Sequence, residues 1–113
     1  MPRLRHYDNL NTARIITVSC FRRLKLLTDP TVISVFLRTL DSTRSRCGVH
    51  LFGCVIMPEH VHLVLHPPDS LTLGPVIGEL KSKSASRIIA DALIDLPESC
   101  WIFKDGRKRC AFW

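Results

Sequence analysis

The chain has 113 residues, 46% of them hydrophobic and 23% charged, so it is one small domain that buries a core, and its composition excludes a disordered chain. Its net charge of +6 favours an acidic partner such as nucleic acid, although a solvated basic surface explains such a charge about as often. No apolar run suits a signal peptide or a membrane span, and the five cysteines form no C-x-x-C pair, so we expect a cytoplasmic protein with reduced thiols and no membrane partner.

The first half of the chain predicts a strand followed by a helix. Residues 1–13 are polar and are expected to form a loose N-terminal tail, which leaves residues 14–113 as the domain. The β-branched run at 15–20 indicates a strand, and a basic connection follows it. Asp29-Pro30 suits the start of a helix and Gly48 its end. Between them, apolar residues repeat at helical spacing: Val32, Ile33, Phe36, Leu37 and Leu40.

The second half predicts a hairpin, a second helix and a short last strand. Residues 49–57 and 60–66 indicate two strands joined by the short turn Pro58-Glu59. An apolar stripe predicts a helix from 71 to about 93, and residues 100–103 indicate a short strand before a basic turn at 104–109. The resulting order β-α-β-β-α-β is that of the ferredoxin-like α+β fold, which has one antiparallel sheet with both helices on one face.

Two histidines, His60 and His62, lie one residue apart in the third predicted strand. Because side chains alternate along a strand, both imidazoles point to one side, whereas Val61, Leu63 and Leu65 point to the other. If those three face the helices, the histidines share the open side of the sheet, where they can bind one divalent metal ion. A metal ion there would polarise a phosphate oxygen. On its own, however, H-x-H is a weak motif that more often marks two surface histidines.

Two other interpretations of the histidine pair are weaker. A zinc site would need a further ligand, for which Cys54 is the candidate. The histidine-triad phosphohydrolases carry the run His-x-His-x-His, but Val64 stands at the fifth position of the corresponding run in this chain. The match to that family therefore fails.

The second predicted strand is apolar at both alternating sets of positions. One set consists of Phe52, Cys54 and Ile56, and the other of Leu51, Val55 and Met57. A strand that is apolar on both sides is typical of a sheet covered on both faces. Since the two helices cover one face, we expect a further element over the other.

Basic residues form three clusters along the chain. They are Arg22, Arg23 and Lys25 after the first strand, Lys81, Lys83 and Arg87 on the second helix, and Arg107, Lys108 and Arg109 near the end. Each cluster is a candidate for contacts with DNA phosphates, which give affinity without sequence information. A single cluster is more often a solvated face, but three in one small basic domain favour DNA. The serines of the second helix, Ser82, Ser84 and Ser86, are expected to be polar positions facing the DNA.

The run VIMPEHVHLVLHP at 55–67 resembles the signature of the single-tyrosine HUH transposases, especially the REP-associated tyrosine transposases of bacteria. TVSCFRRLKLLTDPTVISVF and LGPVIGELKSKSASRI resemble the family's first strand and helix and its second helix, so the similarity extends over about residues 14–113. The resemblance implies that His60 and His62 bind Mg²⁺ or Mn²⁺. It also implies single-stranded or hairpin DNA as the partner, cleavage through a tyrosine that forms a 5′-phosphotyrosine, and a homodimer by analogy.

The chain departs from the family pattern at the nucleophile. The family's tyrosine lies on a helix after the last strand, whereas the only tyrosine here is Tyr7, in the N-terminal tail. We therefore expect a domain that is incomplete at its C-terminus, binds DNA and a metal ion, and does not nick DNA alone. Two alternatives stay open, a noncatalytic nucleic-acid-binding module and a small metal-dependent phosphohydrolase. Metal-independent DNA binding would identify the first, and hydrolysis of a small phosphoester the second.

Overall fold

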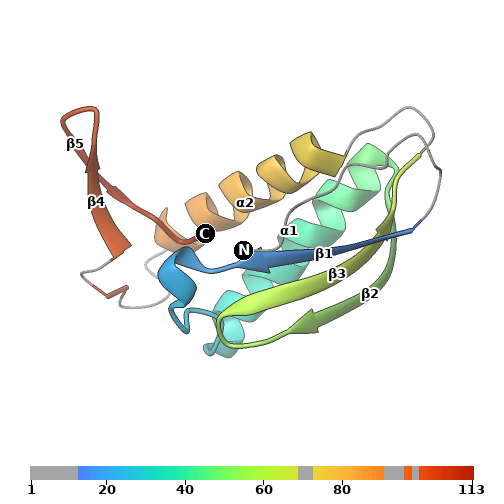
Figure 1. Ribbon diagram of the computed structural model, residues 1–113, viewed down its shortest axis with the longest axis horizontal. Coiled ribbons are helices and arrows are strands. Elements are labelled where there is room, and N and C mark those ends of the chain that lie inside the picture. The colour runs from blue at the N-terminus through green and yellow to red at the C-terminus, as the bar shows by residue number, and fades with distance from the viewer. Residues whose placement is uncertain (1–12, 69–72, 91–95, 98–99) are drawn as a thin grey trace.

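The computed structural model describes residues 13–68, 73–90, 96–97 and 100–113, which form a layer of strands and a layer of helices (Figure 1). The elements are β1 (Arg14–Ser19), the short 3₁₀ turn η2 (Phe21–Arg23), α1 (Pro30–Cys47), β2 (His50–Ile56), β3 (His60–His66), α2 (Leu73–Ala90), β4 (Trp101–Lys104) and β5 (Arg107–Cys110). The predicted α+β class is confirmed. The expected tail at 1–12 and the expected ends of the second helix at 71–72 and 91–93 lie outside the described residues. Within the described parts, neither helix has the length and apolar character needed to cross a membrane.

The sheet has three antiparallel strands in the order β1-β3-β2, so β3 is central. Val61, Leu63 and Leu65 of β3 are at most 1% exposed, because they point into the space between the sheet and the helices. Both helices lie on that side of the sheet (Figure 1). The core between the layers also includes Ile16, Val18, Phe36, Leu80 and Ile88.

The ends of α1 follow from residues with specific capping roles. The Asp29 carboxylate accepts a hydrogen bond from the backbone N–H of Thr31 at 2.7 Å, and Pro30 occupies the first turn. Gly48 ends the helix with a φ of +70°, a left-handed conformation that glycine adopts without a steric penalty. The two caps fix the length of the helix that carries Phe36 into the core.

We expect Asp29→Ala to lower the free energy of unfolding by about 1 kcal/mol, because the Thr31 N–H then loses its acceptor. Asp41→Ala is the matched control, since Asp41 is an exposed aspartate of the same helix whose ion pair with Arg44 contributes at most about 0.5 kcal/mol. Urea unfolding of the two variants checks this difference. Equal losses would contradict the capping role.

A one-residue irregularity in β2 decides which of its side chains face the core. Leu51 pairs with Leu65 and Gly53 pairs with Val64, so Phe52 is an extra residue in the ladder, a β-bulge. The alternation of side chains reverses at this point. The prediction that Phe52 shares a side with the later core residues of the strand is therefore wrong, because an alternation counted across a bulge changes phase. The residues of β2 packed against the core are Leu51, Cys54 and Ile56.

The opposite side of the sheet, which we call the open face, carries exposed apolar side chains. Ile15, Phe52 and Val55 are 79%, 67% and 56% exposed, and Met57 follows at the end of β2. Such a concentration of apolar surface on one face of a small domain is typical of an interaction surface. The sheet is thus apolar on both sides, as expected, and the described residues leave the open face uncovered.

The last expected strand forms, but it does not join the three-stranded sheet. β4 pairs antiparallel with β5 as a separate two-stranded hairpin that projects from the body of the molecule (Figure 1). Asp105 and Gly106 connect the two strands with φ values of +54° and +73°, and a two-residue Asp-Gly turn favours a tight hairpin. The prediction of a basic turn over 104–109 is therefore wrong, because the Asp-Gly turn closes a local ladder whose second strand contains the basic residues. Among the described residues, the ferredoxin-like sheet lacks its fourth strand.

Candidate metal and nucleic-acid site

The rings of His60 and His62 point at one another on the open face. Their Nε2 atoms are 2.9 Å apart, their centroids are 4.6 Å apart, and the ring planes meet at 83°. Both residues are half-buried. Since Val61 between them is fully buried on the helix side, the two imidazoles share one side of β3, as their spacing predicts.

The second ring nitrogen of each histidine also has a partner. His60 Nδ1 lies 2.8 Å from a carboxylate oxygen of Glu59, and His62 Nδ1 lies 3.1 Å from the hydroxyl of Thr17, its register partner on β1. When Glu59 accepts a hydrogen bond from His60 Nδ1–H, the neutral ring carries a lone pair on Nε2, directed at His62. A single proton or a cation between the two Nε2 atoms stabilises this arrangement.

The spacing of the two Nε2 atoms fits an octahedral cation. Adjacent ligands of such an ion, with bonds of about 2.0–2.1 Å, lie about 2.9 Å apart, which is the separation of these atoms. A carboxylate and a hydroxyl on the outer nitrogens are partners of the kind that orient metal-ligating histidines. Within the described ranges, no set of three His, Cys, Asp or Glu residues converges on one point. The pair by itself therefore leaves most positions around a cation to oxygen ligands such as water or phosphate.

The cysteines nearest the pair have other roles. Cys54 packs against the core, on the side of the sheet opposite the histidines, so the zinc interpretation lacks its ligand. Burial raises the pKa of the Cys20 thiol to about 11, so this thiol stays protonated and is a poor nucleophile. Tyr7, the only tyrosine of the chain, lies outside the described residues.

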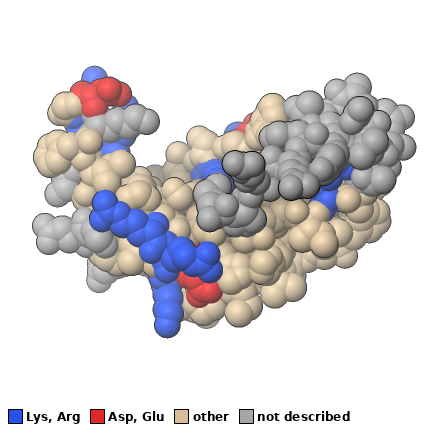
Figure 2. Space-filling view, viewed as in Figure 1, with Lys and Arg blue, Asp and Glu red and all other residues tan. Residues whose placement is uncertain are grey.

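A hollow of about 330 Å³, which we call the basic hollow, lies beside the histidine pair. It is lined by Ser19, Cys20, Phe21, Arg22, Arg23, Lys81 and Trp113. Ser19 is the register partner of His60, so the hollow begins one strand away from the pair. Figure 2 shows lysine and arginine side chains gathered over the end of the molecule where η2 lies. The fold thus joins two members of the first predicted basic cluster to one member of the second.

The other two members of the α2 cluster interact within the helical layer. Lys83 pairs with Glu79 at 3.1 Å, and Arg46 of α1 pairs with the same carboxylate. Arg46 and Lys83 together hold the pKa of the Glu79 carboxyl below its usual value. Arg87 donates a hydrogen bond to the Thr39 hydroxyl at 3.0 Å. The positive charges of Lys83 and Arg87 are therefore less available to DNA than the charge of Lys81, which lines the basic hollow.

The remaining predicted DNA-binding residues are outside the basic hollow. Arg107, Lys108 and Arg109 belong to β5 of the projecting hairpin, where both arginines are exposed. Lys25 is exposed in the connection between η2 and α1. The three clusters of the sequence thus have different surroundings, and only the first two meet in the described structure.

Ser84 does not face the solvent as the sequence interpretation expected. It is buried, its hydroxyl donates to the Leu80 carbonyl at 2.6 Å, and it accepts a hydrogen bond from the indole N–H of Trp113 at 3.0 Å. The physical reason is its position one helical turn after Leu80 and one turn before Ile88, on the stripe that faces the core.

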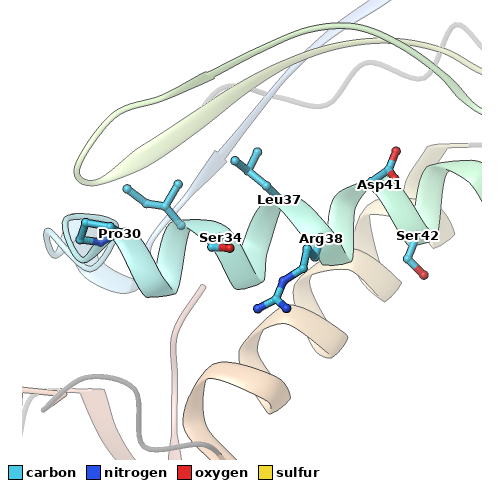
Figure 3. Close-up of a pocket in the computed structure, with 7 residues that line it drawn as sticks. Pro30, Ser34, Leu37, Arg38, Asp41 and Ser42 are labelled. Carbon is cyan, nitrogen blue, oxygen red and sulfur yellow. The ribbon is translucent and has the colours of Figure 1, made fainter.

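A second and larger hollow, of about 460 Å³, runs along α1 alone from Pro30 to Ser42 (Figure 3). Figure 3 shows Leu37 and Asp41 on one side of the helix and Arg38 on the other, so its polar groups do not converge. Asp41 is already paired with Arg44. This hollow has no arrangement of groups suited to catalysis or to binding a cation.

Sequence reasoning missed several residues of the site. Thr17 and Glu59 orient the histidines, and Phe21 lines the basic hollow. The pairing of β1 with β3 would have identified Thr17, since it stands directly opposite His62. Glu59 could have been identified from the sequence, because it is the residue next to His60 in the turn. No local signal connects Trp113 with η2, because they meet only through the tertiary fold.

Comparisons with known proteins agree with this architecture. A family profile described as "Transposase IS200 like" matches residues 9–102. A protein from Deinococcus radiodurans R1, solved as a candidate transposase, has a TM-score of 0.64 and 19% identity, covering 82% of this chain and 67% of that one. A REP-associated tyrosine transposase bound to a REP hairpin has a TM-score of 0.62 and 18% identity, covering 100% of this chain and 60% of that one. No curated protein sequence matches significantly.

The two solved structures establish a shared fold, since their identities are too low to establish more. This chain spans about two thirds of the length of the first and 60% of the second. The family profile, in contrast, covers most of the chain, including both strands of the hairpin that carries the histidine pair. On these grounds the chain belongs to the IS200-like transposase family.

Proposed function

We propose that this chain is the metal- and DNA-binding domain of a single-tyrosine HUH transposase, and that it binds hairpin or single-stranded DNA without cutting it. The observation that carries the proposal is the convergence of two imidazole Nε2 atoms, 2.9 Å apart, beside a hollow lined by three basic side chains. Metal-assisted cleavage and rejoining of DNA is what the family resemblance implies for members that carry the tyrosine nucleophile.

In this proposal His60 and His62 hold Mg²⁺ or Mn²⁺ through their Nε2 atoms. The bound cation supplies stabilisation of negative charge on a phosphate oxygen of the DNA. Glu59 and Thr17 keep the two rings in the ligating orientation by their bonds to Nδ1. The Thr17 hydroxyl can donate or accept, so it keeps its bond to His62 whichever tautomer the ring adopts.

The DNA-binding residues of the proposal are Arg22, Arg23, Lys25, Lys81, Lys83, Arg87, Arg107, Lys108 and Arg109. Those in the basic hollow contribute most, because they are concentrated in a concave surface next to the histidines. Lys83 and Arg87 contribute less, since each already has a protein partner. The REP hairpin bound to the similar transposase supports a hairpin-forming DNA as the partner. A homodimer is a further expectation by analogy with the family, and light scattering checks it.

The chain binds rather than cuts because no suitable nucleophile lies at the described site. Cys20 is protonated at neutral pH, and the only tyrosine, Tyr7, precedes β1 and the family's signature run. The tyrosine of the family follows the second helix and the strand after it. Incubation with labelled DNA is therefore expected to leave the strand intact.

We expect Mn²⁺ to strengthen binding of a DNA hairpin with single-stranded flanks, and the double variant His60→Ala/His62→Ala to lose this effect. The loss in affinity is about ten- to a hundredfold, since a charge-assisted contact contributes about 1.5–3 kcal/mol. Fluorescence anisotropy with Mn²⁺ and with EDTA measures it. Urea unfolding of the variant shows that the fold is kept.

Other outcomes would contradict the proposal in different ways. If the chain binds DNA tightly and neither EDTA nor the double histidine variant changes this affinity, the chain is a noncatalytic nucleic-acid-binding module. Turnover of a small phosphoester by the wild-type chain would identify a phosphohydrolase. Absence of DNA binding at low salt would overturn the proposal as a whole, because phosphate contacts are strongest there.

A further inference from the structure

We propose that the basic hollow binds one nucleotide of the DNA strand, with its phosphate against Arg22, Arg23 and Lys81 and its base against Trp113. This inference rests on the proposed function for the identity of the partner, and it adds a defined subsite next to the histidine pair.

The charge of the lining selects an anion. Three of its seven residues are cations and none is a carboxylate. A concave wall of one sign concentrates the field and attracts the opposite charge more strongly than a flat surface does. The guanidinium of Arg22 lies 4.9 Å from the centre of the Phe21 ring, a cation–π contact that holds it in place before any ligand arrives. The volume of about 330 Å³ lies at the lower end of the range of small-ligand sites.

The backbone of η2 gives an independent argument that these two arginine side chains matter. Arg22 and Arg23 have φ values of +53° and +55°, so two successive residues with side chains adopt the left-handed conformation. Glycine would adopt it without steric conflict, whereas other residues are uncommon there. Backbone strain of this kind persists where the surrounding structure enforces it, and it concentrates at binding and catalytic sites. Here both residues of the strained pair line one hollow.

Trp113 is an aromatic residue of the lining whose ring is held in place by its neighbours. Its ring packs against Phe36 with centroids 5.4 Å apart and against Phe112 at 4.8 Å, and its indole N–H donates to Ser84. These contacts fix the ring of a residue that lines the hollow. An aromatic ring held in this way stacks on a nucleobase of any type. Ser84 lies three residues after Lys81 on α2, so one face of the helix holds the indole and supplies a cation.

The hollow and the histidine pair lie close enough to receive successive parts of one strand. Ser19 lines the hollow and stands opposite His60 in the sheet, and the backbone N–H of Cys20 donates to the Glu59 carbonyl at 2.9 Å. A strand whose phosphate reaches the pair therefore has a neighbouring nucleotide at the mouth of the hollow. The subsite would hold the strand in register with the metal ion.

The test uses Trp101→Phe as the background, because Trp113 is then the only tryptophan of the chain. Titration with a single-stranded oligonucleotide is expected to quench the Trp113 fluorescence. Arg22→Gly/Arg23→Gly in this background is expected to melt at the same temperature or higher, since glycine accepts the positive φ. Its affinity should fall about tenfold or more at 100 mM salt, and the slope of log K against log salt should fall by about 2.

Arg38→Ala/Arg46→Ala is the matched control, because it removes two exposed cations that lie outside the hollow and that the proposal does not place against DNA. It should keep the full quenching of Trp113 at saturation. The subsite is overturned if DNA does not change the Trp113 fluorescence and the glycine variant binds DNA like the wild type. If manganese-dependent DNA binding persists in that case, the proposed function stands. If the two double variants lowered the affinity for DNA equally, the cations of the hollow would act only through the overall charge of the domain. That result would also overturn the subsite. Inorganic phosphate competing as well as thymidine monophosphate would overturn the stacking contact with Trp113.

Discussion

Manganese binding to the protein alone is expected to disappear when both His60 and His62 are replaced by alanine. The two Nε2 atoms are 2.9 Å apart, so they can bind one cation together. The loss should exceed the roughly 10–100-fold effect of removing an outer partner of a metal ligand. Electron paramagnetic resonance of free Mn²⁺ measures the bound fraction directly.

Thr17→Val and Glu59→Gln are the graded controls for this experiment. Each leaves both Nε2 atoms in place but weakens the orientation of one ring, so we expect losses of about 10–100-fold. Valine keeps the branched shape of threonine in the strand. A double histidine variant that binds Mn²⁺ like the wild type would place the cation elsewhere, and controls as severe as the double variant would show that orientation alone decides affinity.

Leu63→Ala is expected to destabilise the fold by about 2–5 kcal/mol, the largest effect of any single change considered for this chain. Leu63 is 0% exposed in the central strand, between Ile16 and Cys54 in the register, so its removal leaves a cavity between the sheet and the helices. The free energy of unfolding measured by urea titration checks the value.

Val64→Ala is the matched change at the next residue of the same strand. Val64 points to the open face, over Gly53, and we expect a loss below about 1 kcal/mol. The pair of variants therefore tests the alternation that places the histidines on the open face. Comparable losses for the two would mean that the open face is as tightly packed as the core, against the exposure of Val55 and Phe52.

Much of the fold could be predicted because local signals and tertiary packing agree. The alternation of β3 and the cap at Asp29 each depend on nearby residues, and both are found where the sequence places them. The errors occurred where one residue changes the phase or the partner of a strand. Phe52 shifts the alternation of β2, and the Asp105-Gly106 turn pairs β4 with β5 instead of with the sheet. An Asp-Gly pair between two short extended runs is itself a hairpin signal, so the second error was avoidable.

The candidate site could be predicted only in its local part. The spacing of His60 and His62 determines that their rings share one side of the strand, and this follows from the geometry of any strand. The basic hollow, in contrast, is made by the end of β1, η2, α2 and the segment after β5. Charge alone grouped Lys81 with Lys83, whereas the rotation of the helix sends the first to the hollow and the second to Glu79. Such distinctions need the tertiary arrangement.

The bulge in β2 also determines how chains of this kind should be compared. Phe52 has no partner of its own in the ladder, so deleting it would join Leu51 to Gly53 and leave the other strand partners unchanged. A homologue shorter by one residue at this point would keep the same core. If an alignment places this gap at another position of β2, every residue between that position and position 52 is matched with a neighbour that points to the other side of the sheet. A difference of one residue in the length of β2 should therefore be placed at position 52.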